Sequence, residues 1–184
     1  MSDIRIDVVA HDELTPNLLG DLRRLFDDEY FDQFGVWSPE QPYGYAPHDH
    51  HVIASSDAGV VGHVGWGRRT VGVGGDDLVI AGVGGVLVSH QGRGRQLGAK
   101  LMARAAQSMR EDGGIEFGYL GCREEVVPFY VSCGWHRISA GERSIGRDGR
   151  LTVAPPGQPI LVFPVGRPLD SWPSGVIDLR GRAW

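Results

Sequence analysis

The chain has 184 residues, a length that suits one ordinary folded domain. Hydrophobic residues make up 41% and charged residues 22%, which excludes a disordered chain, and no apolar run is long enough to span a membrane. The net charge of −5 argues against a nucleic-acid-binding protein, because such proteins need a concentrated basic face.

The charge is divided unevenly along the chain. Residues 1–50 carry eleven acidic side chains and three arginines, a net charge of −8, whereas residues 51–184 carry a net charge of +3. This division suits a cationic ligand near the first quarter of the chain and an anionic ligand near the arginines. The alternative is that the charged side chains only keep the surface solvated. The first ten residues lack the apolar core of a signal peptide, and Cys122 and Cys133 are too few for a disulfide framework. We therefore expect a reduced, cytoplasmic protein.

The first quarter of the chain predicts a strand, a helix and a long loop. Residues 4–8 alternate apolar and polar side chains, which indicates a strand. Thr15 and Pro16 are typical of a helix start, and the leucine stripe that follows fades after Asp28. Residues 29–50 then hold six aromatic residues and three prolines without periodicity. Such a segment forms either a binding wall or a hydrophobic flap over the core.

The rest of the chain predicts a mainly antiparallel sheet with two more helices. Tight turns separate β-branched runs, and glycines interrupt the run before residue 88, which indicates a bulge or the close approach of a ligand or backbone. The expected strands are 52–54, 60–73, 78–88, 115–120, 135–138 and 160–165. Helices are expected from Leu97 to Gly113 and over 126–132, and the tail 166–184 is expected to be mostly irregular.

The strongest local feature is the loop Gln91-Gly92-Arg93-Gly94-Arg95-Gln96, between a strand and a helix. Its glycines let backbone N–H groups converge on an oxyanion, and the helix N-terminus and two arginines add positive charge. The loop lacks the Gly-Lys-Ser/Thr ending of a Walker loop and the spacing of a dinucleotide fingerprint. It therefore predicts a pyrophosphate site of another kind, with a simple turn as the alternative.

The order of these elements resembles the GCN5-related N-acetyltransferase (GNAT) superfamily over residues 4–165. The loop pattern of that superfamily is Gln/Arg-x-x-Gly-x-Gly/Ala, and Gln91, Arg93 and Gly94 occupy its informative positions, whereas Gln96 departs from it. The resemblance implies a single α/β (α+β) domain over residues 1–184 with a mixed, mainly antiparallel, splayed sheet, and acetyl-CoA as the donor. The residues implied to bind this donor through their backbone are Val86, Leu87, Val88, Arg93, Gly94, Arg95, Gln96, Leu97, Gly98 and Ala99.

The implied chemistry is attack of an amine on a thioester. The Val86 N–H is placed to stabilise the tetrahedral oxyanion. Tyr130 is the candidate general acid that protonates the leaving thiolate, a role that the superfamily resemblance supports, and packing against the core is its alternative. No general base stands out. The candidates are Asp32, Asp49, Glu125, the terminal carboxylate of Trp184 and bulk solvent.

Within the superfamily the chain is most similar to the aminoglycoside 2′-N-acetyltransferases, through residues 83–88, 93–97, 129–135 and 178–184. This resemblance implies acetylation of an antibiotic amine, with resistance as the result, and a homodimer. Gly84 replaces an acidic residue and Gly121 a serine of that family, which favours kasugamycin as the acceptor. Segments 29–50 and 166–184 are expected to form the acceptor cleft. Its expected contact residues are Asp32, Trp37, Tyr43, Asp49, Gly84, Gly85 and Trp184.

A second resemblance lies in the tail, in Phe163-Pro164-Val165-Gly166-Arg167-Pro168, Trp172-Pro173 and Gly175. These residues are similar to the nodulation N-acyltransferases, which place a fatty acyl chain on a chito-oligosaccharide amine. The resemblance implies an amino-sugar N-acyltransferase with a different donor as the alternative. A non-enzymatic CoA-binding module is a further alternative.

A histidine cluster and two cysteines complete the candidates. His48, His50 and His51 match no zinc-ligand spacing, so we expect no metal, and two of these histidines are candidates to line the acceptor cleft. Cys122 and Cys133 are expected to pack as small hydrophobic side chains. A nucleophilic Cys122 would need a His–Asp pair that the sequence does not identify.

Overall fold

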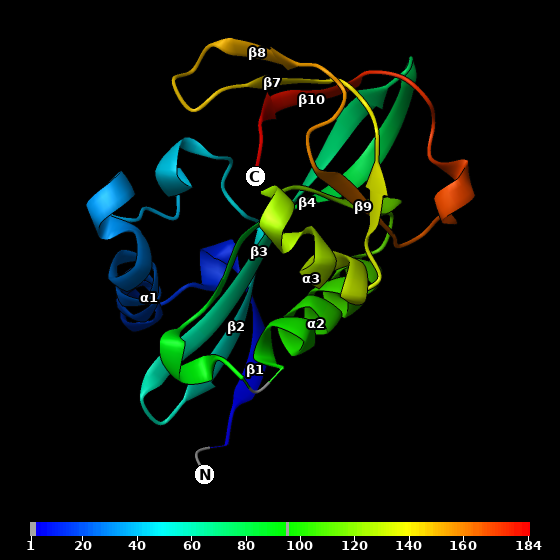
Figure 1. Ribbon diagram of the computed structural model, residues 1–184. Helices are drawn as coiled ribbons and strands as arrows, with labels where there is room; N and C mark the ends of the chain where they lie inside the picture. The colour runs from blue at the N-terminus through cyan, green and yellow to red at the C-terminus, as the bar shows by residue number, and fades with distance from the viewer. Residues whose placement is uncertain (1–2, 95) are drawn as a thin grey trace.

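The computed structural model describes residues 3–94 and 96–184 and is built around a mixed sheet (Figure 1). The strands are β1 (Arg5–Ala10), β2 (His50–Ser56), β3 (Gly59–Val73), β4 (Asp76–Val88), β5 (Phe117–Gly121), β6 (His136–Ile138), β7 (Glu142–Ile145), β8 (Leu151–Ala154), β9 (Ile160–Pro164) and β10 (Ile177–Arg182). The helices are α1 (Pro16–Phe34), α2 (Leu97–Asp112) and α3 (Val127–Ser132). No helix in these two described stretches is long and apolar enough to span a membrane.

The strands follow the order β6-β9-β5-β4-β3-β10-β7-β8. Outside this order, β2 pairs with the first half of β3, and β1 pairs with β2. Neighbouring strands run antiparallel except for the pairs β4–β5 and β7–β10. The predicted α+β class with a mainly antiparallel sheet is therefore confirmed. Because β3 is long, its first half pairs with β2 and its last residues pair with β10, so the sheet branches beside the middle of β3.

Helix α1 begins where the sequence predicts but ends later. The Thr15 hydroxyl accepts a hydrogen bond from the Leu18 N–H at 3.3 Å, and Pro16 occupies the first turn. The predicted end near Asp28 was wrong, because the helix continues to Phe34. Its last turns are stabilised by the returning chain, since the Phe34 ring lies 5.3 Å from that of Tyr43. The aromatic segment thus starts as helix and supplies one wall of a cleft.

The two faces of the sheet are covered by different helices. On β2, Val52 and Ala54 belong to the core beneath α2, whereas Ile53 packs with α1. This alternation is the period-2 pattern of a strand buried on both sides. The sheet is therefore held between α1 on one face and α2 on the other.

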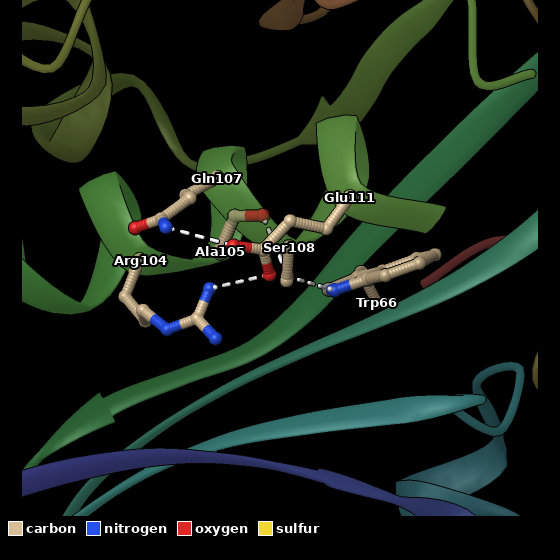
Figure 2. A network of polar contacts seen from close by, with 6 residues as sticks. All are labelled: Trp66, Arg104, Ala105, Gln107, Ser108 and Glu111. Atoms are coloured by element: carbon tan, nitrogen blue, oxygen red, sulfur yellow. Dashed lines mark hydrogen bonds and ion pairs between the residues drawn. The ribbon is translucent and has the colours of Figure 1, made fainter. Parts of the chain in front are cut away.

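A buried polar contact links β3 to α2 (Figure 2). The Trp66 indole N–H donates to the Ser108 hydroxyl at 2.9 Å, and this hydroxyl donates to the Ala105 carbonyl at 2.8 Å. Beside them Glu111 accepts from Arg104 and Gln107 on the outer side of the helix. The large Trp66 side chain is thus buried with its polar atom satisfied.

The C-terminal part contains structure that the sequence pattern did not predict. The tail 166–184 is mostly irregular, as expected, but it also contains β10, which pairs antiparallel with β3 and parallel with β7. Figure 1 shows β7, β8 and the red β10 together at one end of the molecule. Beyond β10 the Ala183 carbonyl accepts a hydrogen bond from the Ala46 N–H at 2.8 Å. Strand β10 thus carries Trp184 to the aromatic segment.

Candidate active site

The sheet opens between β4 and β5. The two strands pair only along three positions, from Ile80 opposite Phe117 to Gly82 opposite Tyr119. Beyond Gly82 they separate, which gives the predicted splay. A cavity of about 390 Å³ lies at this opening and is called the central cavity. It is lined by Phe26, Tyr30, Gln33, Phe34, Trp37, Pro42, Tyr43, Tyr45, His48, residues 83–86, residues 121–123, Val126, Tyr130 and Trp184.

The central cavity brings together most of the expected catalytic and acceptor residues, from distant parts of the chain. Those that line it are Trp37, Tyr43, Gly84, Gly85, Val86, Tyr130 and Trp184. Asp32 and Glu125 are exposed and lie outside this lining. Asp49 also lies outside it, because its carboxylate accepts the Arg68 backbone N–H at 2.6 Å. These three candidate bases are therefore not placed to contact a ligand in the cavity.

The predicted interruption of β4 is a bulge at Gly85 and Val86. Gly84 pairs with Gly65 and Leu87 pairs with His63, so the two bulge residues stand outside the register. Gly85 has a φ of +58°, which favours glycine. The bulge takes the Gly85–Val86 peptide group out of the β3–β4 register at the wall of the cavity.

Two glycines of β3 and β4 make room for the Trp184 indole. A Cβ atom on Gly82 would lie 2.1 Å from the indole ring, and one on Gly67 would lie 2.9 Å from its nitrogen. The Arg69 guanidinium lies over the ring, 3.9 Å from its centroid. The predicted close approach to the glycine-rich strand is thus made here by a side chain of the same protein.

His48 occupies the neighbouring pair of glycines. A Cβ atom on Gly65 would lie 2.4 Å from the imidazole, and one on Gly84 would lie 3.0 Å from its Nε2 atom. Burial lowers the pKa of His48 to about 3, so the ring is neutral at neutral pH. Of His48, His50 and His51, only His48 belongs to the described lining of the cavity. The His50 ring stacks on the Trp66 ring instead.

Several buried polar atoms around the cavity have no hydrogen-bond partner among the described residues. They are Nε1 of Trp37, both ring nitrogens of His48 and Nε1 of Trp184. Buried polar groups in proteins are nearly always paired, so this set indicates a polar ligand with hydroxyl or amide groups. Trp37 itself is 1% exposed and stacks on Phe26 at 4.8 Å, so it belongs to the core beneath the cavity as well as to its wall.

Tyr130 both packs in the core and faces the cavity. It is 8% exposed, and its ring lies 5.1 Å from that of Phe129 and 6.4 Å from that of Trp135. Burial raises the pKa of its hydroxyl, so the phenol keeps its proton at neutral pH and can donate it. Burial likewise raises the pKa of the Cys122 thiol, which disfavours a nucleophilic thiolate.

The predicted phosphate loop leads from β4 into the N-terminus of α2. Leu87 and Val88 are the last residues of β4, and their side chains pack in the core. A ligand beside them would therefore contact their backbone groups. The first backbone N–H groups of α2 have no helical acceptor and no side-chain cap, which favours an anion. They belong to Leu97, Gly98 and Ala99.

The departure from the family pattern at Gln96 has a structural cost. This residue has a φ of +54°, a left-handed conformation that costs an L residue about 1–2 kcal/mol relative to a right-handed one. Gly94 also has a positive φ, of +79°. The Arg93 guanidinium lies 3.4 Å from the Glu29 carboxylate on α1. The predicted ligand residue Arg95 lies outside the described residues.

We expect the protein to lose stability as the pH falls below 6.5. Burial lowers the pKa of His48 to about 3, of His51 to about 2 and of His63 to about 4. Unfolded histidines bind protons near pH 6.5, so between pH 6.5 and 4 the unfolded chain binds more protons, and each histidine lowers the unfolding free energy by up to about 1.4 kcal/mol per pH unit. Urea unfolding at pH 7.5 and 5.0 measures the loss.

The matched variants are His48→Phe, which should reduce this pH dependence because only His51 and His63 then contribute, and His136→Gln on the surface, which should leave it unchanged. Equal unfolding free energies of the unmodified protein at the two pH values would contradict the prediction.

Within the described stretches, no group of three or more His, Cys, Asp and Glu side chains is arranged to hold a metal ion.

Solved structures with the same arrangement are GNAT proteins. The GNAT family N-acetyltransferase YhbS of Escherichia coli, solved in complex with CoA, superposes with a TM-score of 0.62 at 16% identity over 97% of this chain and 89% of that one. Tetrahymena GCN5 superposes with a TM-score of 0.56 at 14% identity over 90% of this chain and 99% of that one. These similarities confirm the predicted GNAT fold.

The sequence relatives are nodulation proteins. Nodulation protein A of Sinorhizobium fredii is 32% identical over 139 residues, 70% of this chain and 69% of the relative. Nodulation protein A of Rhizobium leguminosarum bv. trifolii is 28% identical over 168 residues, 84% of this chain and 79% of the relative. The family model "Nodulation protein A (NodA)" matches residues 4–183. The matches support the second resemblance, in the tail, over the aminoglycoside one, and the chain belongs to the nodulation protein A family.

Proposed function

We propose that this protein is an N-acyltransferase that moves an acyl group from an acyl-CoA thioester to the amino group of an amino-sugar oligosaccharide. The observation that carries the proposal is the splay of β4 and β5 beyond Gly82, which opens into a cavity that also holds Tyr130. The family membership supports the amino-sugar acceptor. The CoA complex of a protein with the same fold supports the donor.

The donor side is formed by backbone groups. The loop at Arg93 and Gly94 and the first turn of α2 offer N–H groups to the pyrophosphate. The free edge of β4 over residues 83–86 can bind the pantetheine as an added strand would. This path leads the thioester from the helix N-terminus into the central cavity, beside Tyr130.

In the proposed reaction the neutral amine nitrogen attacks the thioester carbon and forms the C–N bond. The carbonyl oxygen becomes an oxyanion that accepts the Val86 N–H. The C–S bond then breaks, Tyr130 protonates the leaving thiolate, and the amide nitrogen gives up its extra proton to solvent. The phenolate of Tyr130 is reprotonated from solvent.

The charge of the cavity favours an acceptor with one free amine over a polycationic aminoglycoside. Among the described lining residues none has an acidic side chain, so the cationic Arg123 and the terminal carboxylate of Trp184 stand without further acidic groups to bind several amines. Burial in such surroundings keeps an amine neutral, which is the form that attacks. The acidic first quarter therefore does not line the site as the charge division suggested.

The lining also suits sugars. The rings of Tyr30, Phe34, Tyr43 and Tyr45 offer aromatic faces, and the unpaired nitrogens of His48 and Trp184 suit hydroxyl and acetamido groups. A second cavity of about 320 Å³ shares Tyr45, residues 121–123 and Trp184 with the first. It continues past Glu142 and gives an extended acceptor a second place to bind.

The test is CoA thiol release with acetyl-CoA and hexadecanoyl-CoA against three acceptors: a chitotetraose with one free amine, the fully N-acetylated chitotetraose and kasugamycin. We expect thiol release and an N-acylated product with the free-amine chitotetraose and none with the fully acetylated control. The donor pair decides the chain length of the acyl group. Higher kcat/KM with kasugamycin, or no acceptor-dependent release, would overturn the proposal.

A further inference from the structure

A chain of histidines crosses the sheet from the surface to the bulge of β4. The Glu40 carboxylate lies 3.2 Å from Nε2 of His11, and Nδ1 of His11 lies 3.2 Å from Nε2 of His51. Nδ1 of His51 lies 2.9 Å from Nε2 of His63, and Nδ1 of His63 lies 2.7 Å from the Gly85 carbonyl oxygen. His51 and His63 are fully buried. His11 directly follows β1, His51 lies on β2, His63 on β3 and Gly85 on β4.

One arrangement of protons satisfies every contact in this chain. A carbonyl oxygen only accepts, so Nδ1 of His63 donates to it, and Nε2 of this neutral ring accepts. Nδ1 of His51 therefore donates to His63, and its Nε2 accepts from Nδ1 of His11. The Glu40 carboxylate can only accept, so its contact with Nε2 of His11 forms a hydrogen bond when that nitrogen carries a proton. The N–H groups at Nδ1 of His11, His51 and His63 then all point toward the bulge, and the Nε2–H of His11 points to Glu40.

The last member of this chain bonds the peptide group that the proposed reaction uses. Gly85 and Val86 stand outside the β3–β4 register and line the central cavity. In a planar trans peptide the C=O and N–H groups point in opposite directions, and the described chain has no cis peptide. Because the Gly85 oxygen faces buried His63, the Val86 N–H points away from it, to the cavity side.

We infer that His11, His51 and His63 are positioning residues that orient and polarise the Gly85–Val86 peptide, so that its N–H is a strong donor to the oxyanion. A hydrogen bond to the carbonyl of an amide strengthens the donor at its nitrogen, and bonds in a chain reinforce one another. The inference rests on the proposed function for its catalytic consequence. The chain ends at a carbonyl oxygen, so it carries polarisation and no proton into the cavity.

The test separates His63 as a donor from His63 as a link. His63→Leu removes the donor, whereas His63→Asn keeps an N–H close to the position of Nδ1 and only breaks the link to His51. We expect His63→Leu to lower the single-turnover rate about 10- to 100-fold with little change in donor or acceptor KM, and His63→Asn to recover most of that loss. His136→Gln, on the exposed surface of β6, is the control and should behave like the unmodified protein.

The polarisation itself is measured without substrate. The NMR resonance of the Val86 amide proton should move upfield in His63→Leu, and in the same direction but less in His11→Gln, whose ring is partly exposed and which leaves the core intact. An unchanged Val86 resonance in both variants, or a rate loss that His63→Asn does not recover, would overturn the inference. Absence of acyl transfer with a shifted Val86 resonance would overturn the proposed function and leave the polarisation established.

Discussion

Replacing Gly82 by alanine should destabilise the protein by about 3 kcal/mol and raise the acceptor KM about 10-fold. The added Cβ atom would lie 2.1 Å from the Trp184 ring, too close for any real contact, so the indole must leave its place on the strand. Trp184 lines the central cavity, and its displacement changes the acceptor wall while the phosphate loop at α2 is untouched. Urea unfolding and acceptor titration measure the two effects.

The double variant Gly82→Ala/Trp184→Ala shows whether the clash is the cause. Its loss of unfolding free energy should be smaller than the sum of the losses in the two single variants by at least about 1 kcal/mol, because the side chain that clashes is gone. Gly72→Ala on β3 is the control, since the nearest atom to its Cβ would be the flexible end of Arg180, at 3.3 Å, and the next residue, Asp178, would be in ordinary contact at 3.8 Å. Additive losses in the double variant would show that the indole does not depend on Gly82.

Tyr130→Phe should lower kcat about 100-fold and leave the Kd for acyl-CoA unchanged. The hydroxyl has lost most of its solvent and keeps its proton, because burial raises its pKa. No hydrogen bond of this hydroxyl to a described residue is lost on substitution, so the unfolding free energy should change by less than about 0.5 kcal/mol. Steady-state kinetics and calorimetric titration with CoA measure the two effects.

Two further measurements test whether Tyr130 protonates the thiolate. The thiolate of an acyl donor with a far more acidic thiol leaves without being protonated. Such a donor should therefore restore most of the rate that Tyr130→Phe loses. Tyr30→Phe makes the same change at another tyrosine of the cavity and should lose less than about 3-fold. Equal losses in the two variants, or no recovery with the acidic thiol, would remove Tyr130 from the proton transfer.

Local patterns in the sequence determined the beginning of α1, most strand positions and the bulge. Thr15 caps the first turn of α1, and the fixed φ of Pro16 suits the first helical position. The glycines near residue 85 predicted the interruption of β4. The order of the expected elements, together with the loop at residues 91–96 and Tyr130, gave the resemblance that predicted the GNAT fold. These features depend on neighbours in sequence, which is why the sequence shows them.

Tertiary contacts decided the rest. The last turns of α1 form because Phe34 meets Tyr43, and β10 forms because β3 and β7 offer it edges. No local pattern shows that His48 and Trp184 rest on glycines of β3 and β4, because each contact joins segments far apart in the chain. The sequence by itself determined the fold class and predicted a donor side, because both depend on backbone and local pattern. Only the three-dimensional arrangement decided the acceptor side, because its side chains meet through long-range packing.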